Sequence, residues 1–404
     1  MKLLHTSDWH LGRMLYTKKD RQDEHACFLK WLLQTIQDNG VDLLLVAGDI
    51  FDNASPGSAS QKMYYDFLLD VRKAGCRNMI VVGGNHDSPS FLNAPKAVLS
   101  ALNITVIGNA GDNPADEVIV VRDADEKPMA IVCAAPFLRE RDLSRFTEGE
   151  TYSDRSRRIA ESIKKHYEQL AEIAREIQKN TDATIPVIAT GHLSVAGGKT
   201  VEDDGVRETY IGNIECVGSD IFPEIFDYVA LGHYHIPSVI SEKIRYCGSP
   251  LPMGFGEAAQ RKCVYMVDFQ KDNTTVSSLE IPAFQQLESI RGDRAFISGR
   301  LHALKASGAS VWVEIIYEGS SVFPDFTSWA AEQTADTNIE ILKLQNRQYL
   351  TEVLTQDDST QPLEDLERLA VFDKLLDKNK VPDEQKSTFR ALYDEITDSL
   401  IIES

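Results

Sequence analysis

The chain has 404 residues, of which 43% are hydrophobic and 26% are charged, a composition typical of globular proteins that excludes a disordered or fibrous chain. This length predicts two or three domains rather than a single core. The formal net charge of −20 argues against a chain that binds nucleic acid through its own surface alone, because lysine and arginine supply most of the non-specific affinity for phosphate backbones.

The first two thirds of the chain alternates short apolar runs with helical patterns, as α/β folds do. Several runs are continuously apolar, which indicates strands covered on both faces. The predicted strands are KLLHTS (2–7), DLLLVAG (42–48), NMIVVGG (78–84), TVIG (105–108), EVIVV (117–121), MAIVCAA (129–135), IPVIATG (185–191) and YVALG (228–232).

Two helices are predicted among these strands. Apolar residues from Phe28 to Ile36 recur on one helical face, and Gly40 is placed to end that helix. A longer helix is expected from about Ser153 to Lys179.

The pattern changes near Ile281. From there it predicts a strand–helix–strand–helix–strand domain, followed from about Leu363 by two amphipathic helices. We therefore expect three parts, which are residues 1–275, 281–348 and the helix pair 360–404. Residues 351–404 carry 14 acidic and six basic side chains, so much of the negative charge lies away from the motifs described next.

The six cysteines are scattered, and no two of them form a CxxC pair. A disulfide framework or a thiolate zinc site is therefore not expected, and a reducing cytoplasm fits this pattern best. The opening MKLLHTSDWH becomes polar after four residues, so we expect no signal peptide. The longest apolar runs are too short to cross a bilayer.

Five predicted strands end in residues that bind metals. Because ligands gather beyond the carboxyl ends of the strands of an α/β sheet, these ends are expected to converge. If the strands persist, Asp8 and His10 share one face, as do His233 and His235. A single histidine at a strand end is usually structural, but five such ends in order favour a functional site. The residues are Asp8, His10, Asp49, Asn85, His86, Asp87, His192, His233 and His235.

Carboxylates, imidazoles and one amide form a mixed nitrogen and oxygen ligand set without thiolate, which suits Mn²⁺, Fe²⁺ or Zn²⁺. Two carboxylates, four histidines and one asparagine amide make a set of seven ligands. Seven ligands are too many for one ion but suit two ions that share a bridging carboxylate. Two such ions, about 3.5–4 Å apart, attract phosphate, activate a water and stabilise the attacking and leaving oxygens.

The motifs DWH, GDIFD, GGNHD, GH and GHYH, in this order, resemble the calcineurin-like metallophosphoesterases. LHTSDWHLGR, VAGDIFDNASP, ATGHLSVAG and YVALGHYH are more closely similar to the family of nuclease subunits of bacterial SbcC–SbcD complexes. The resemblance is strong over residues 1–260. It implies a metallophosphoesterase β-sandwich core flanked by helices, a small α/β cap domain that helps to hold DNA, and a C-terminal helix pair.

The resemblance also implies roles for single residues. Asp8, His10 and His235 would hold one metal, most simply Mn²⁺. Asn85, His192 and His233 would hold the other, and Asp49 would bridge both. His86 would contact the scissile phosphate and assist the leaving oxygen, and Asp87 would orient His86.

One position departs from the family pattern. Relatives of this nuclease family outside bacteria often carry a second catalytic histidine just after the bridging-aspartate motif, where this chain has Asp52. The role of that histidine does not transfer, and Asp52 is interpreted as a turn residue. In the loop GRMLYTKKDR, we expect Arg13, Tyr16, Lys18 and Lys19 to contact substrate, with a solvated loop as the alternative.

The resemblance implies Mn²⁺-dependent 3′→5′ exonuclease action on duplex DNA and endonuclease cleavage at hairpins or blocked ends. It also implies a homodimer within a heterotetramer. The C-terminal helices would dock on the SbcC ATPase, with packing on their own nuclease domain as the alternative. No GxxxxGK[ST] motif is present, so a partner must supply any ATP dependence.

Two other function classes remain. One is a stand-alone phosphoesterase acting on a small phosphodiester or phosphomonoester, because the same metal centre serves many substrates. The residues appended beyond the core count against it. The other is a non-catalytic scaffold, which should have lost ligands, whereas here the full set is present.

Overall fold

The computed structural model describes residues 1–143, 151–200, 216–271, 273–319, 323 and 325–346, together with the single residues 386 and 390. Residues Met1–Asn346 form one compact unit, and the unit Arg347–Ser404 falls almost wholly outside the described residues. Apart from residues 386 and 390, the predicted helix pair 360–404 therefore also lies outside them. Within the described part of the chain, no helix is both long and apolar enough to span a membrane.

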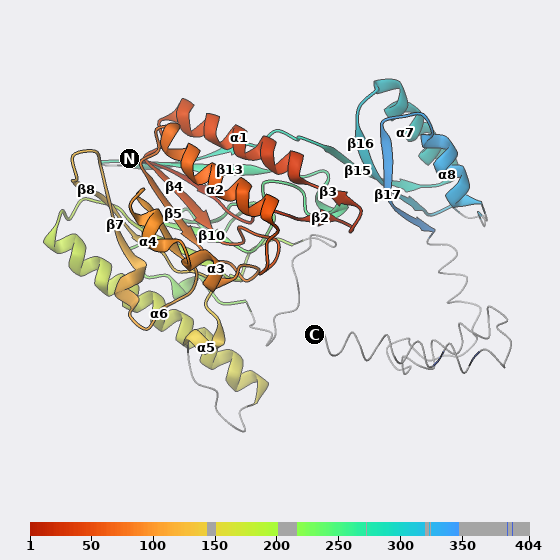
Figure 1. Cartoon of the computed structure of the whole chain (residues 1–404). Helices are drawn as coiled ribbons and strands as arrows, with labels where there is room; N and C mark the ends of the chain where they lie inside the picture. The colour runs from red at the N-terminus through yellow and green to blue at the C-terminus, as the bar shows by residue number, and fades with distance from the viewer. Residues whose placement is uncertain are drawn as a thin grey trace. The chain divides into compact units, whose positions relative to one another are not determined.

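Two six-stranded sheets form the core of the described unit (Figure 1). The first has the order β14-β13-β1-β4-β5-β6, in which β1, β4, β5 and β6 run parallel. Its strands are β1 (Lys2–Thr6), β4 (Leu43–Ala47), β5 (Asn78–Val82), β6 (Ile104–Ile107), β13 (Cys263–Gln270) and β14 (Asn273–Glu280).

The second sheet has the order β11-β12-β10-β9-β8-β7, with β8, β9, β10 and β12 parallel. Its strands are β7 (Val118–Arg122), β8 (Pro128–Cys133), β9 (Val187–His192), β10 (Tyr228–Gly232), β11 (Ser238–Val239) and β12 (Ile244–Tyr246).

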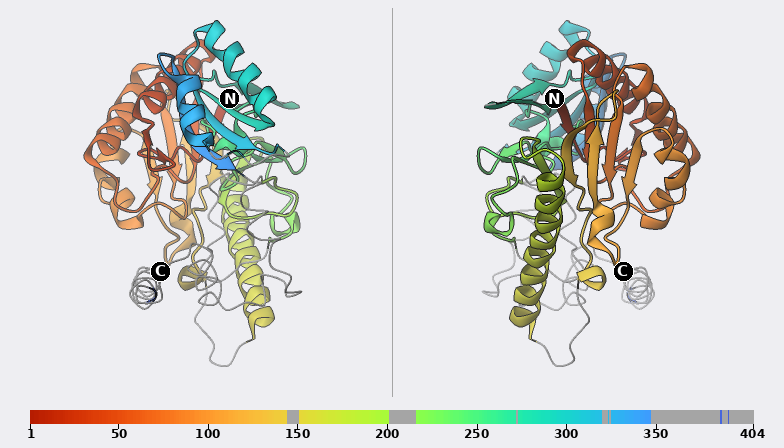
Figure 2. Two further views of the ribbon diagram at one scale, coloured as in Figure 1. Left: turned by 90° about the vertical axis from the view of Figure 1, so that its right-hand side faces the viewer. Right: turned by 90° about the vertical axis from the view of Figure 1, so that its left-hand side faces the viewer.

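Alternate residues of the central strands face different apolar layers. Leu43 and Leu45 of β4 pack between the two sheets, whereas Leu44 and Val46 face the helices. In Figures 1 and 2, α1 and α2 cover the outer face of the first sheet, and α6 covers the outer face of the second. Burial on both faces explains the continuously apolar runs, and the predicted α/β sandwich flanked by helices is confirmed.

The helices of the sandwich have clear local signals. Gly40, with φ 61°, ends α1 in the left-handed conformation that glycine adopts without strain. The side chain of Thr151 caps α6 by accepting a hydrogen bond from the Asp154 N–H. The helices are α1 (Gln22–Asn39), α2 (Ser58–Lys73), α3 (Pro89–Asn93), α4 (Lys96–Ser100), α5 (Glu140–Leu143) and α6 (Tyr152–Asn180).

A three-stranded parallel sheet with two helices follows the sandwich. Its elements are β15 (Gln286–Gly292), α7 (Arg294–Ser307), β16 (Val311–Tyr317), α8 (Phe326–Thr334) and β17 (Ile339–Asn346). It packs on the hairpin formed by β2 (Met14–Leu15) and β3 (Lys19–Asp20), where Leu15 shares an apolar cluster with Trp312 and Leu342.

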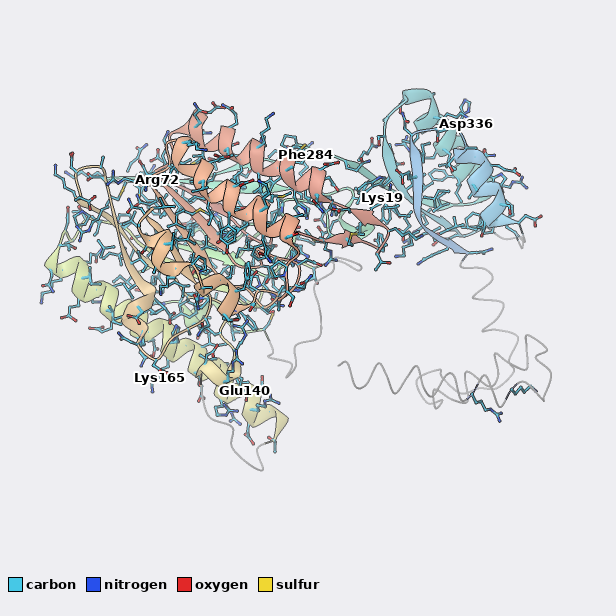
Figure 3. The ribbon with its side chains drawn as sticks, viewed as in Figure 1. Lys19, Arg72, Glu140, Lys165, Phe284 and Asp336 are labelled. Atoms are coloured by element: carbon cyan, nitrogen blue, oxygen red, sulfur yellow. The ribbon has the colours of Figure 1, made fainter. Side chains whose placement is uncertain are left out.

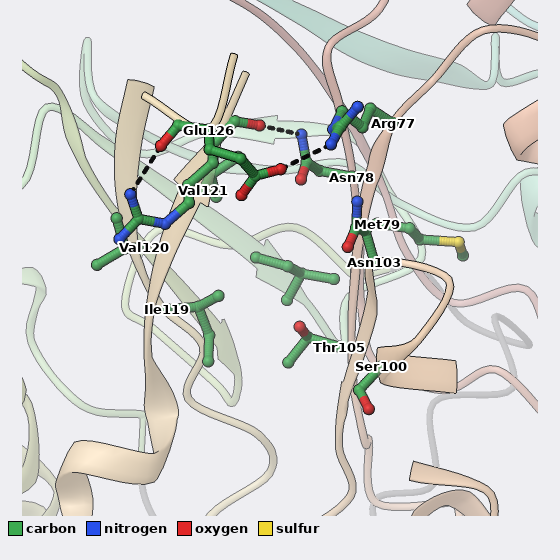
Figure 4. Close-up of a pocket in the computed structure, with 12 residues that line it drawn as sticks. Arg77, Asn78, Met79, Ser100, Asn103, Thr105, Ile119, Val120, Val121 and Glu126 are labelled. Atoms are coloured by element: carbon green, nitrogen blue, oxygen red, sulfur yellow. Dashed lines mark hydrogen bonds and ion pairs between the residues drawn. The ribbon is translucent and has the colours of Figure 1, made fainter. Parts of the chain in front are cut away.

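A pocket of about 160 Å³ lies beside the sandwich strands (Figure 4). Its lining includes Asn78 at the start of β5 and Arg122 at the end of the antiparallel β7. Glu126 forms an ion pair with Arg77 at 2.8 Å and accepts, through its backbone carbonyl, a 2.9 Å hydrogen bond from Arg122. The pocket is therefore at the opposite end of β5 from the loop that holds Asn85 and His86.

Candidate metal centre

The strand ends β1, β4, β5, β9 and β10 bring the predicted ligands together. Parallel pairing aligns the carboxyl ends of β1, β4 and β5 in one sheet and of β9 and β10 in the other. Six of the seven side chains are buried, and Asn85 is half-buried. The seven are Asp8, His10, Asp49, Asn85, His192, His233 and His235.

The loop after β1 holds its two ligands in turns. β1 ends at Thr6, and both Asp8 (φ 52°) and His10 (φ 46°) adopt left-handed backbone. Their N–H groups donate to Gly48 O and Asp49 O, each at 3.0 Å. The predicted strand therefore does not continue through Asp8 and His10. Backbone hydrogen bonds to the loop after β4 bring the two side chains to the centre instead.

Two histidines face each other in one half of the centre. His10 Nε2 and His235 Nε2 are 3.1 Å apart, and a ligand oxygen of Asp8 lies within 4.8 Å of both ligand nitrogens. Ligand atoms about 2.1 Å from one ion are about 3.0–3.4 Å from each other when their bonds meet at 90° to 110°. The two imidazoles are therefore spaced as ligands of a single ion.

The other half of the centre lies around Asn85. Its Oδ1 is 3.0 Å from His192 Nε2 and 3.2 Å from His233 Nδ1. Asp49 Oδ2 is 3.2 Å from His192 Nε2 and 3.7 Å from His10 Nε2, so one carboxylate oxygen reaches both halves. His233 lies in this half and His235 in the other, because the chain turns after Gly232, where β10 ends.

Burial shifts the pKa values of several side chains in the centre. It raises the pKa of Asp8 to about 7 and lowers the pKa of His233 to about 3. Burial alone would lower the pKa of His192, but the neighbouring Asp49 raises it to about 9. The attraction to Asp49 that raises the pKa of His192 shows that the centre favours positive charge, which divalent cations would supply. The donor set and its spacing fit two such ions.

Comparisons with known proteins identify the family. A model of calcineurin-like phosphoesterases matches residues 1–237, and one described as a type 5 capsule protein repressor C-terminal domain matches residues 283–380. The SbcD subunit of the nuclease SbcCD from Escherichia coli strain K12 is 33% identical over 398 residues, which are 97% of each chain. This chain belongs to the SbcD family of calcineurin-like phosphoesterases.

Two further proteins are similar to a smaller part of the chain. The SbcD subunit of the nuclease SbcCD from Rhodobacter capsulatus is 36% identical over 283 residues, or 66% of each chain. A solved dimetal phosphatase from Danio rerio is 14% identical, with a TM-score of 0.40, and covers 70% of this chain and 97% of that one.

His86 lies at the edge of this SbcD-family centre. Its backbone N–H donates to Asp49 Oδ1 at 2.9 Å, and its ring Nδ1 donates to the Asp52 carbonyl oxygen at 2.8 Å. The ring centroid is 4.8 Å from that of His10. With Nδ1 bonded to a carbonyl, Nε2 is the ring nitrogen left to act on a substrate.

Asp87 links two loops of the centre. Its carboxylate accepts hydrogen bonds from the N–H groups of Gly84 (2.9 Å), Ile50 (3.1 Å) and Phe51 (3.0 Å). Any effect of Asp87 on His86 therefore acts through the backbone of the loop that carries both residues.

Sequence reasoning missed the position of Asp52. Its Oδ1 is 3.4 Å from His10 Nδ1 and 3.1 Å from a guanidinium nitrogen of Arg13. The carboxylate therefore lies against a predicted metal ligand, and Asp52 is more than a turn residue. No local pattern signals this contact, because it forms only when the loops after β1 and β4 meet.

Two predicted substrate residues, Arg13 and Tyr16, contact other parts of the protein. Arg13 pairs with Asp52, as described above. The Tyr16 hydroxyl accepts a 3.0 Å hydrogen bond from the Phe255 N–H, and the two rings stack at 5.3 Å. Arg13 thus adjoins the metal centre, whereas Tyr16 packs on the loop after β12.

The lysines of the β2–β3 hairpin contact the three-stranded sheet. Lys18 Nζ donates to Leu342 O at 2.7 Å. Lys19, labelled in Figure 3, pairs with Glu340 and lies 5.8 Å from the Trp312 ring centroid. In this structure both lysines join the hairpin to that sheet, and contact with substrate remains a prediction.

Gly232 allows the two sheets to approach each other at the centre. A Cβ atom at this position would lie 2.0 Å from Ala47 O and 3.0 Å from His192 Nδ1. Gly232→Ala is therefore expected to displace the loops after β4 and β10 and to lower metal-dependent phosphodiester hydrolysis by about 10²-fold. Steady-state kinetics checks this. Gly299→Ala in α7, where a Cβ meets nothing within 4 Å, is the control and should match wild type.

Proposed function

We propose that this chain is the nuclease subunit of a bacterial SbcC–SbcD complex and hydrolyses DNA phosphodiester bonds with two divalent metal ions. One observation carries the proposal: seven side chains with nitrogen or oxygen donor atoms, Asp49 among them, come from five strand ends and meet at one centre, with His86 beside them. The Escherichia coli relative that matches 97% of this chain is named as the SbcD subunit of the nuclease SbcCD.

The ligands divide into two sets. One ion would be held by Asp8, His10 and His235. The other would be held by Asn85, His192 and His233, and Asp49 would bridge the two ions. Mn²⁺ fits this mixture of imidazole and carboxylate. When bound, the two ions supply positive charge for a phosphate and make a water more acidic. The ligand residues orient these charges, and their burial strengthens each interaction by excluding water.

His86 would move the proton in this reaction. Its Nδ1–H bond to the Asp52 carbonyl fixes the ring, so Nε2 can donate a proton to the sugar oxygen that leaves. Asp87 would keep the His86 loop in register with the loop after β4 through its three backbone hydrogen bonds. Departure of a neutral hydroxyl instead of an alkoxide lowers the barrier.

The substrates we propose are duplex ends, cut 3′→5′, and hairpins or blocked ends, cut endonucleolytically, in DNA repair and recombination. Residues 1–275 would form the nuclease domain and residues 281–348 a cap that helps to hold DNA. The segment that joins the metal centre to this cap carries the predicted substrate residues Arg13, Tyr16, Lys18 and Lys19. With a net charge of −20, much of the DNA affinity would come from the metal ions and from the partner.

The partner we propose is the SbcC ATPase. The C-terminal helix pair 360–404 would bind it, two copies of each subunit would form the complex, and the cytoplasm would be its location. The free thiols of all six cysteines are consistent with that compartment. A stand-alone phosphoesterase is not favoured, because the match to the relative extends over 97% of the chain.

The decisive experiment is cleavage of an end-labelled DNA hairpin by the purified chain in Mn²⁺, with and without SbcC and ATP. We expect cleavage that increases with SbcC and ATP and disappears in Asp49→Ala. Cleavage that persists in Asp49→Ala would place the active site elsewhere. Hydrolysis of a small phosphodiester without hairpin cleavage would retain the metal centre and exclude DNA as the substrate.

A further inference from the structure

The histidines of one metal position each have a carboxylate on their outer side. Because His10 Nε2 and His235 Nε2 face each other, their Nδ1 atoms point away from the shared position. His10 Nδ1 is 3.4 Å from Asp52 Oδ1, and His235 Nδ1 is 3.8 Å from Glu257 Oε1. Both rings therefore lie between the metal position and an acidic side chain.

Each of these carboxylates is held in turn by a cation. Asp52 pairs with Arg13 at 3.1 Å, and Glu257 pairs with the buried ammonium of Lys262. Lys262 Nζ also donates to His235 O at 2.9 Å, so the same network fixes the backbone of that ligand. Glu257 is fully buried, whereas the Asp52 side chain is 22% exposed.

His192, in the other half of the centre, differs in this respect. His192 Nδ1 donates to the backbone carbonyl of Ala47 at 2.9 Å, a neutral acceptor. A carboxylate on Nδ1 makes an imidazole a stronger ligand than a carbonyl does and also fixes its tautomer and orientation. His10 and His235 therefore each have a carboxylate within 4 Å of Nδ1, whereas the Nδ1 partner of His192 is neutral.

We propose that Asp52 and Glu257 are positioning residues for His10 and His235, and that they make the Asp8–His10–His235 position the tighter of the two metal positions. The inference rests on the proposed dimetal function. It gives Asp52 a role beyond that of a turn residue. That role is to act on metal affinity through His10 rather than on the substrate.

The test is titration of the metal-free protein with Mn²⁺ against a fluorescent metal indicator, without DNA. Wild type should bind two ions with different affinities. In Asp52→Asn, the affinity of the tighter ion should fall about 10- to 100-fold while the weaker one changes little. High Mn²⁺ should restore kcat. Asp125→Asn, in the exposed β7–β8 turn, is the matched control and should titrate like wild type.

The role of Glu257 is tested with a double variant, because substituting Glu257 alone would leave the buried Lys262 ammonium without its counter-charge. The double variant Glu257→Gln with Lys262→Met removes both charges and should also weaken the tighter ion. Unchanged melting temperatures of the metal-free variants would show that each still folds.

Unchanged Mn²⁺ affinities in both variants would overturn the inference and leave the dimetal function standing. Loss of cleavage in Asp52→Asn with normal Mn²⁺ binding would also overturn it, since Asp52 would then act on the substrate. Failure of wild type to bind two ions would instead remove the proposed function itself.

Discussion

Asp49→Asn is expected to lower Mn²⁺-dependent DNA cleavage by at least about 10³-fold, or roughly 4 kcal/mol of barrier. Asp49 Oδ2 lies 3.2 Å from His192 Nε2 and 3.7 Å from His10 Nε2, and it is the ligand that reaches both halves. Asparagine keeps the volume but removes the negative charge between two cations. Cleavage of a labelled duplex, followed over time in Mn²⁺, measures the loss.

Two controls separate lost chemistry from lost structure. Asp49 Oδ1 also accepts the His86 N–H at 2.9 Å, and an asparagine oxygen can keep that bond. The variant should therefore fold, bind SbcC and retain at most one tightly bound Mn²⁺. A variant that keeps a tenth of wild-type cleavage would show that Asp49 does not bridge two ions.

The sandwich strands could be predicted because they are covered on both faces. Leu43–Ala47 and Tyr228–Gly232 are buried throughout, and such apolar runs stand out against the polar loops around them. Burial is not a sufficient signal everywhere, because β13 (Cys263–Gln270) is buried at six of its eight residues and is absent from the predicted strands. The short β11 and β12 and the edge strand β14 (Asn273–Glu280) are absent as well. β14 is rich in serine and threonine and mostly exposed at the sheet edge, so it has no buried run to reveal it.

The ligand residues could be predicted from strand ends, but their geometry could not. The side chains of Asp8 and His10 converge because the backbone turns left-handed at both, supported by bonds to Gly48 and Asp49 from another loop. The contacts of Asp52 have the same origin. Such contacts depend on tertiary approach between strand ends, which short-range periodicity does not contain.

His86→Gln is expected to lower kcat by about 10²- to 10⁴-fold while leaving Mn²⁺ affinity unchanged. The ring is fixed by its bond to Asp52 O, and glutamine cannot donate a proton as imidazolium does. His302→Gln, on the exposed face of α7, is the matched control and should behave as wild type. Single-turnover cleavage and Mn²⁺ titration together measure the two effects.

Ligand atoms of His86, His10 and Asp49 lie within 4.8 Å of one another, so these residues could also hold an ion. The two roles predict different results. A proton donor matters little when the leaving group needs no proton, so His86→Gln should hydrolyse bis(4-nitrophenyl) phosphate far closer to the wild-type rate than it cleaves DNA. A metal ligand is needed for both substrates, so equal losses, together with weaker Mn²⁺ binding, would make His86 a ligand. A selective loss on DNA would identify His86 as the group that protonates the departing sugar oxygen.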